Sequence, residues 1–245
     1  MQKSGFTLLE LSIVIVIIGL IVAGISAGQS LVRQANLRTV LTDAEKYKTA
    51  YNTFKLQYDA IPGDMANASD YWPGAGNGDG NGDIACTVGV TEENALFFLH
   101  LANAGIIDGS YSGDVPSCNT YSTPRPTIGT DLPAAPFNNS AYDVGNTIYN
   151  NVAEGKYFYF YRIQFSTPDN SWKGVVTASE AHALDKKSDD GIANEGKTHA
   201  RADRQQWPDQ GNTAVCTSSV YNNGTASDYD LSDTGENCAM SFSLQ

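Results

Sequence analysis

The feature that most constrains this chain is an apolar run close to its N-terminus. Residues 6–27 form a stretch of 22 residues whose only polar members are Thr7, Glu10, Ser12 and Ser26. A helix of about 20 apolar residues spans the roughly 30 Å hydrocarbon core of a bilayer. The run therefore predicts a membrane-spanning helix.

A secretory signal and an ordinary membrane anchor are the simpler interpretations of this run. A secretory signal has an apolar core of about 7–15 residues, which is shorter than this run. The leader before the run has one positively charged residue, Lys3, and ends at Gly5. An ordinary anchor leaves Glu10 unexplained, because a carboxylate inside an apolar helix costs on the order of 2.5–3.5 kcal/mol. A carboxylate in that position indicates a function.

The residues around this carboxylate follow a specific order, which reads Gly5, Phe6, Thr7, Leu8, Leu9 and Glu10. This segment resembles the type IV prepilin and pseudopilin family, whose hallmark is a short basic leader ending in Gly before Phe-Thr-Leu, with Glu fifth after the cut. The resemblance implies that a prepilin peptidase cuts between Gly5 and Phe6 and methylates the new amine of Phe6. Many type IVa pilins have a proline late in the run, whereas this chain reads Ala23-Gly24-Ile25-Ser26-Ala27, so the subclass stays open.

The resemblance also implies a function. The chain would be a structural subunit that polymerises through its hydrophobic helix into a type IV pilus or a type II secretion pseudopilus. The alternative is a minor pilin whose head acts as an adhesin, a DNA-uptake module or an initiation module. The implied partners are copies of itself or other pilins in a helical filament, the prepilin peptidase, the inner-membrane assembly platform and, before assembly, membrane lipid. The implied location is the inner membrane, crossed once with the head in the periplasm, and then a periplasmic or cell-surface filament.

The chemistry of Glu10 fits assembly. A free amine at Phe6 and a carboxylate at Glu10 are both costly in hydrocarbon, and each Glu10 can pair with the Phe6 ammonium of a neighbouring subunit. This pairing neutralises two poorly solvated charges and sets the axial register between subunits. The alternative is a glutamate that reaches the membrane interface and has no role.

The apolar run continues into an amphipathic helix. Apolar residues recur at spacings of three or four, which is typical of one helix face; they are Leu37, Val40, Leu41, Ala44, Tyr47, Tyr51, Phe54 and Tyr58. One helix is therefore predicted over residues 6–58, with its stripe packed against the sheet of the head. The predicted organisation is a leader at 1–5, a membrane or filament-core helix at 6–28, an amphipathic helix at 29–60 and a head at 61–245.

The rest of the chain predicts a small mixed head. A capped helix is expected over 91–104, closing at Gly105, and residues 106–156 are expected to be rich in loops. Strands are predicted by β-branched and aromatic content at 157–165, 174–179, 213–221 and 238–244. A long N-terminal helix packed on a small antiparallel sheet is an α+β fold of the type IV pilin kind.

Four cysteines lie far apart in the sequence, at Cys86, Cys118, Cys216 and Cys238. Their separations exclude CxxC metal and redox motifs, and four cysteines allow three pairings. An even count outside the cytoplasm favours disulfides, and we favour Cys86–Cys118 and Cys216–Cys238. The alternative is buried free thiols.

Asp79, Asn81 and Asp83 have the D-x-N-x-D spacing that begins a calcium loop. The twelfth position is Val90 where a calcium loop has Glu, and Glu92 and Glu93 lie just beyond and could complete a different loop. A calcium ion and a plain polar turn therefore both remain open, and no other cofactor is expected. A second acidic group, formed by Asp185, Asp189 and Asp190, is expected to be a solvated turn paired with Lys186 and Lys187, with a metal site as the alternative.

The charge distribution bears on partners. The net charge is −12, and residues 1–42 hold Lys3, Arg33 and Arg38 against Glu10, which leaves −14 for residues 43–245. An acidic head argues against nucleic-acid binding, which depends on phosphate neutralisation. The sequence contains no HExxH motif, and we do not expect an enzyme.

Overall fold

The computed structural model describes residues 7–84, 86–87, 91–113, 127–151, 156–166, 174–193, 195–202, 216–217 and 228–244. The chain divides into two compact units, Met1–Thr39 and Val40–Gln245. The second unit contains every strand in the part of the chain that the structure describes.

The first helix, α1, runs from Leu8 to Tyr58, so the long helix predicted over 6–58 is confirmed. The helix ends where Asp59 adopts a left-handed backbone with φ of 51°, a conformation that terminates helices. The Asp59 N–H still donates to the Lys55 carbonyl at 3.0 Å. Pro62 then prevents any continuation, because proline has no N–H to donate.

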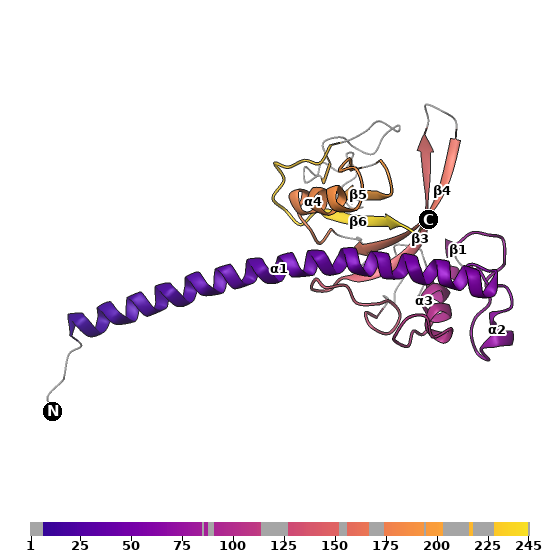
Figure 1. Ribbon diagram of the computed structural model, residues 1–245, viewed down its shortest axis with the longest axis horizontal. Helices are drawn as coiled ribbons and strands as arrows, with labels where there is room; N and C mark the ends of the chain where they lie inside the picture. Colours follow the sequence, from indigo (N-terminus) through magenta and orange to yellow (C-terminus); the bar gives the residue numbers. More distant parts are fainter. Residues whose placement is uncertain are drawn as a thin grey trace. The chain divides into compact units, whose positions relative to one another are not determined.

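The head combines helices with a four-stranded antiparallel sheet in the order β3-β4-β6-β5 (Figure 1). Its strands are β3 (Ala141–Asn151), β4 (Lys156–Ser166), β5 (Thr198–Ala202) and β6 (Cys238–Ser243). Two short strands, β1 (Cys86–Thr87) and β2 (Thr91–Glu92), pair separately. The other helices are α2 (Ala68–Tyr71), α3 (Glu93–Asn103) and α4 (Ala178–Ser188). The α+β prediction is therefore confirmed.

The apolar stripe of α1 lies in the core of the head. Val40, Ala44, Tyr47, Tyr51 and Phe54 are buried, as their spacing predicts. The Tyr47 ring meets Phe98 of α3 at 5.5 Å in an edge-on contact and Tyr142 of β3 at 5.3 Å. Burying aromatic rings of this size supplies much of the energy of a small core.

Two strand predictions are correct and one is wrong. Strands β4 and β6 match the segments predicted at 157–165 and 238–244. The segment 174–179 forms only a single bridge, between Val176 and Cys238, because Thr177 caps α4 through a reciprocal pair of hydrogen bonds with Glu180. Of the segment 213–221, only residues 216–217 are described, and Thr217 bridges Tyr229.

The expectation that 106–156 is mostly loop is wrong for its last part. Strand β3 occupies residues 141–151 and pairs with β4 along its whole length, from Ala141 opposite Ser166 to Asn151 opposite Lys156. Its glycine and asparagines disfavour a strand by propensity, and the pairing with β4 overrides that preference.

Candidate functional site

The N-terminal end of α1 is closed by a hydrogen-bonded pair of side chains. The backbone N–H and the hydroxyl of Thr7 both donate to Oε2 of Glu10, at 2.8 and 2.9 Å, and the Glu10 N–H donates to Thr7 Oγ1 at 3.2 Å. This reciprocal arrangement is a capping box, in which a Thr at the N-cap and a Glu three residues later satisfy free N–H groups of the first turn. The Glu10 carboxylate is thereby bound to Thr7, the residue that follows Phe6 in the sequence.

The next six turns of α1 present apolar side chains to the surroundings. Leu8 is 88% exposed, Leu20 is 70% exposed and Val32 is 60% exposed. Among the helices of the described residues, α1 alone is long and apolar enough to cross a membrane, judged by length and composition. Exposure of so many aliphatic side chains is unfavourable in water and calls for a bilayer or other helices as surroundings.

Comparison with protein families identifies this segment. Residues 1–26 match the family described as the prokaryotic N-terminal methylation motif. The chain carries the type IV prepilin signature. No curated protein and no solved structure matches the chain, so the signature stands on the N-terminal segment.

The signature confirms the resemblance of the N-terminal segment to the type IV prepilin family. Such a signature implies processing by prepilin peptidase and assembly into filaments with other pilins. The α+β arrangement with a long apolar N-terminal helix is consistent with a pilin-like fold. Gly5 and Phe6, the residues predicted to flank the cut, lie outside the described residues, and their role stays a prediction.

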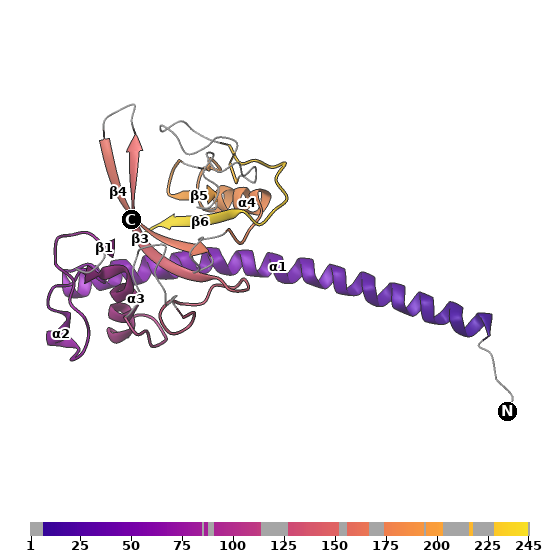
Figure 2. The ribbon, with the colours of Figure 1, turned by 180° about the vertical axis from the view of Figure 1, so that it is seen from behind.

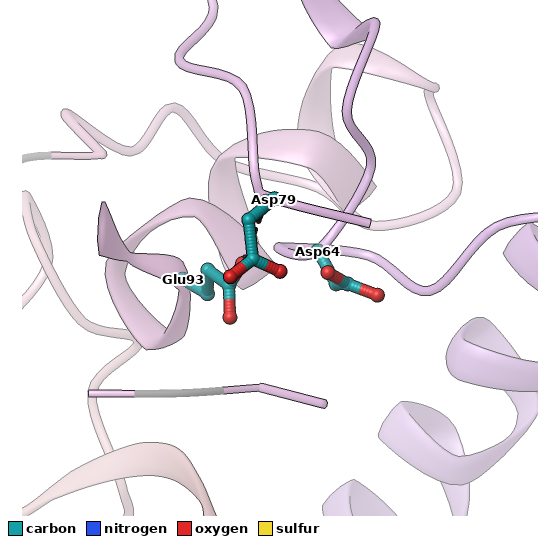
Figure 3. A group of neighbouring side chains, drawn as sticks. All are labelled: Asp64, Asp79 and Glu93. Atoms are coloured by element: carbon teal, nitrogen blue, oxygen red, sulfur yellow. Dashed lines mark hydrogen bonds between the residues drawn. The ribbon is translucent and has the colours of Figure 1, made fainter. Parts of the chain in front are cut away.

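A second group of functional candidates lies at the start of α3, where Glu93 meets the loops that follow α1. Carboxylate oxygens of Asp64, Asp79 and Glu93 all lie within 4.8 Å of one another (Figure 3). Asp64 and Glu93 are 4% and 0% exposed, whereas Asp79 is exposed. Three carboxylates this close repel one another unless a proton or a cation intervenes.

Backbone N–H groups of the polar loop hold these carboxylates in place. Asp64 accepts from Asn81 N at 3.1 Å and from Gly82 N at 2.9 Å, and Glu93 accepts from Asp79 N at 2.9 Å. Burial raises the pKa of Asp64, and these backbone donors oppose the rise. Carboxylate oxygens are the ligands that calcium prefers in proteins, so the group has the chemistry to hold such a cation.

The structure gives the predicted set Asp79, Asn81 and Asp83 a different arrangement. Asn81 donates to both carboxylate oxygens of Asp79 at 2.9 Å, and the Asp83 N–H donates to Asn81 Oδ1 at 2.7 Å. These contacts make successive side-chain turns. Only Asp79 of the three belongs to the acidic group. It is joined there by Glu93, which lies just beyond the predicted loop, and by Asp64, which the sequence pattern did not indicate.

The loop can approach Asp64 because residue 78 is glycine. A Cβ atom at Gly78 would collide with the backbone of Asp64. The Gly78 N–H also donates to the Met65 carbonyl at 3.0 Å, and the Gly80 N–H donates to the Asp64 carbonyl at 3.0 Å.

His100 of α3 holds the two ends of the same loop region by hydrogen bonds to its backbone. Its Nδ1 accepts from the Gly63 N–H at 2.9 Å, and its Nε2 lies 2.8 Å from the Gly76 carbonyl oxygen. The neutral tautomer with the proton on Nε2 satisfies both contacts. Burial lowers the pKa of His100, and its ring stacks on Phe54 of α1.

The group Asp185, Asp189 and Asp190 also brings carboxylate oxygens within 4.8 Å of one another, but the expectation of a simply solvated turn is wrong for Asp185. That residue is buried and accepts from the Tyr229 hydroxyl at 2.7 Å. Asp189 accepts from the backbone N–H groups of Lys197 and Thr198. These carboxylates connect α4 to β5 and to the C-terminal segment.

The cysteines are partly described. Cys216 and Cys238 form a disulfide with a Cα–Cα distance of 5.0 Å, which is the pairing that we favoured for these two. Cys86 lies in β1, and Cys118 lies outside the described residues, so the second pairing stays a prediction.

Proposed function

We propose that this chain is a structural subunit that polymerises through α1 into a filament, either a type IV pilus or a type II secretion pseudopilus. The observation that carries the proposal is that α1 has both an exposed apolar surface and a carboxylate fixed at its first turn. A membrane anchor needs only the apolar helix. The capping box places Glu10 at the end where cleavage would create a new ammonium group.

The proposed sequence of events starts in the inner membrane. The chain inserts once with its head in the periplasm, and prepilin peptidase cuts between Gly5 and Phe6 and methylates the Phe6 amine. An assembly platform then transfers α1 from lipid into the filament. In the filament, the Glu10 carboxylate of one subunit lies against the Phe6 ammonium of its neighbour, and each charge compensates the desolvation of the other.

The second candidate is a minor pilin whose head binds a target, as an adhesin, a DNA-uptake module or an initiation module. Residues 59–245 contain 9 Lys and Arg against 24 Asp and Glu, a net charge of −15. That charge disfavours a DNA phosphate backbone as the target. Abundance distinguishes the two candidates, since a major subunit makes up most of a purified filament.

We extend the proposal to calcium, with Asp64, Asp79 and Glu93 as the carboxylate ligands. The support is the proximity of three carboxylates, two of them buried. When bound, the ion would offset their mutual repulsion and fasten the loop 76–83 against α3. We propose a structural role for the calcium ion, because the groups that surround it are carboxylates and backbone N–H groups that hold the loop in place.

The test of the proposed function is intact-mass measurement on sheared surface filaments together with cryo-EM of the same preparation. We expect a filament protein that lacks residues 1–5, carries one methyl group on Phe6 and packs its α1 helices in the filament core. A mature protein that begins at Met1, or one cut near Ala27, would contradict the proposal.

A further inference from the structure

The loop that connects α2 to β1 contains the same tetrapeptide twice. Residues 76–79 and 80–83 both read Gly-Asn-Gly-Asp, so Asn77 and Asn81 have identical immediate neighbours. Helices α2 and α3 and strand β1 lie at the end of α1 near Tyr58 in both views (Figures 1 and 2), and the loop belongs to this region. A difference in chemistry between the two asparagines of the folded protein therefore comes from the fold.

An asparagine followed by glycine can react with its own backbone. The glycine nitrogen attacks Cγ of the asparagine, a new N–Cγ bond forms as the Cγ–Nδ2 bond breaks, and the proton of the glycine nitrogen leaves with Nδ2 as ammonia. The product is a five-membered succinimide ring. Water then opens this ring at either carbonyl carbon and gives an aspartate or an isoaspartate. Glycine favours the closure because it has no Cβ to obstruct the ring.

The first tetrapeptide is held at both of its reacting groups by other parts of the chain. The Asn77 Oδ1 accepts from Ser69 N of α2 at 2.8 Å, and the Gly78 N–H donates to the Met65 carbonyl at 3.0 Å. A Cβ atom at Gly78 would collide with the Asp64 backbone, so the chain at this glycine is tightly packed. Ring closure requires the carboxamide and the glycine nitrogen to move together, and here each is fixed to a different segment.

In the second tetrapeptide, the carboxamide is bound to the backbone that follows it. The Asn81 Oδ1 accepts from the Asp83 N–H at 2.7 Å. This bond closes a turn that includes the Gly82 nitrogen, so Cγ of Asn81 stays beside the atom that would attack it. The Gly82 N–H donates to the Asp64 carboxylate at 2.9 Å, and a side chain can follow a moving nitrogen, whereas a backbone carbonyl cannot. A Cβ atom at Gly82 would meet nothing within 4 Å, which leaves room for the ring.

We propose that Asn81 is a site of spontaneous modification in the folded protein, which converts it through a succinimide to aspartate and isoaspartate, and that the fold protects Asn77. The reaction uses water and no cofactor. Asn81 and Gly82 are both exposed, so water reaches the ring. A third Asn-Gly pair, at residues 223–224, lies outside the described residues.

The modification changes the loop beside the acidic group. Asn81 Nδ2 donates to Asp79 Oδ2 at 2.9 Å. An aspartate at position 81 has no such donor and places a second negative charge next to Asp79. An isoaspartate also lengthens the backbone by one methylene ahead of Gly82. In the absence of a cation, the modified loop should therefore be less stable than the original one.

Incubation of the full chain in excess detergent and EDTA, folded and denatured in parallel, tests the proposal. EDTA makes the result independent of the proposed calcium ion, and tandem mass spectrometry measures conversion at Asn77 and Asn81 separately. In denaturant the two rates should be equal, because the tetrapeptides are identical. In the folded protein, Asn81 should convert about ten times faster than Asn77 or more, which corresponds to a difference of about 1.4 kcal/mol in the barrier.

Aspartate variants test the consequence for stability. Asn81→Asp should lower the unfolding temperature in EDTA, because the hydrogen bond to Asp79 is lost and two carboxylates face each other. Asn77→Asp is the matched control. A carboxylate oxygen at position 77 still accepts from Ser69 N, so this variant should unfold close to the temperature of the wild type.

The outcomes decide the proposal on their own. Equal rates in the folded protein, a faster rate at Asn77, or no conversion at Asn81 during a period in which the denatured chain reacts at both positions would overturn it. An equal loss of unfolding temperature in both aspartate variants would contradict the stated effect on the loop. Preferential conversion at Asn81 would support the site whether or not the chain enters filaments, so the proposed function is tested separately.

Discussion

The Tyr142 hydroxyl of β3 donates a 2.7 Å hydrogen bond to the Asp43 carboxylate of α1. The two residues are 99 positions apart in the sequence, and the bond connects the amphipathic part of the helix to the first strand of the sheet. Burial, followed by the interaction with Asp43, raises the pKa of Tyr142. The phenol therefore remains a donor throughout the physiological range.

Removal of this donor tests how strongly the sheet holds the helix. Tyr142→Phe keeps the ring that contacts Tyr47 and removes only the hydroxyl, so we expect a loss of about 1.5–3 kcal/mol, as for a hydrogen bond to a charged acceptor. Asp43→Asn should cost less, because an amide oxygen still accepts. A double-mutant cycle by thermal unfolding measures the coupling, and additive losses would show that the bond contributes nothing.

Asp143 should make the stability of the head fall as the pH rises towards neutrality. Burial raises the pKa of Asp143 from 3.8 to about 7, against donation by Val144 N and the Asn94 side chain. The unfolded chain ionises near 3.8, so the stabilisation is fully present below that pH and is lost as pH rises to about 7.

The matched variant is Asp143→Asn, which keeps the shape of the side chain and cannot ionise. We expect it to flatten the stability profile between pH 4 and 7 and to raise stability at pH 8 by about 2–4 kcal/mol. Equilibrium denaturation at several pH values provides the comparison, and an unchanged slope would exclude Asp143 as its source.

His100 should act in the opposite direction. Burial lowers the pKa of His100 in the folded head. In the unfolded chain, the same side chain is protonated near pH 6.5, so the unfolded state binds a proton that the folded state does not. Stability should fall as pH drops below about 6.5, until the folded His100 is itself protonated and its Nδ1 can no longer accept from Gly63. His100→Asn, which offers an amide oxygen near the position of Nδ1, should weaken this acid dependence. If His100→Asn lost stability at acid pH as steeply as the wild type, the acid dependence would come from another titrating residue.

Calcium binding predicts a chelator-sensitive increment of stability. If the ion binds at Asp64, Asp79 and Glu93, saturating calcium should raise the unfolding temperature, with the size set by the ratio of free ion to dissociation constant. Asp79→Asn should remove most of this increment, whereas Asp83→Asn, outside the three-carboxylate group, should keep it. Identical melting in calcium and in EDTA would make the loop a plain hydrogen-bonded turn.

Sequence patterns predicted the elements that carry their own local signal. The apolar run and stripe predicted α1, and five aromatic residues in succession predicted β4. The pattern Thr177-x-x-Glu180 was a capping signal that the β-branched residues Val175 and Val176 outweighed, and the helix α4 was missed. Strand β3 has no comparable signal, since it is held by pairing with β4, whose paired residues lie 5 to 25 positions further along the chain.

The acidic group shows the same limit. Asp64 follows the end of α1, Asp79 lies in the polar loop and Glu93 opens α3, so only the folded chain brings the three together. No fixed spacing describes such a set. The spacing of Asp79, Asn81 and Asp83 described the turn that presents one of the three carboxylates.

At the N-terminus, the structure gives Glu10 two separable roles, as a helix cap and as a charge partner in assembly. The cap needs a side-chain acceptor at Glu10 for the N–H and hydroxyl of Thr7, and Gln serves at this position as well as Glu. The charge pair needs a carboxylate. Glu10→Gln therefore keeps the cap and removes the charge, whereas Thr7→Val keeps the charge and removes the side-chain cap at a cost of about 0.5–2 kcal/mol.

If the charge role decides assembly, Glu10→Gln and Glu10→Ala should both be inserted and cut at Gly5, because the leader is unchanged, and both should fail to enter filaments. Leaving one ion of a buried pair uncompensated costs roughly 3–5 kcal/mol, which is two or three decades in an equilibrium constant at about 1.4 kcal/mol per decade.

Thr7→Val should still assemble, and Glu10→Asp should assemble in part, since the charge remains on a shorter side chain. The measurement is the fraction of processed protein in sheared filaments and in the inner membrane, with each variant as the sole copy. Filaments built normally from Glu10→Gln would leave only the cap as the role of this residue, since the amide can close the helix but cannot neutralise the Phe6 ammonium of a neighbour.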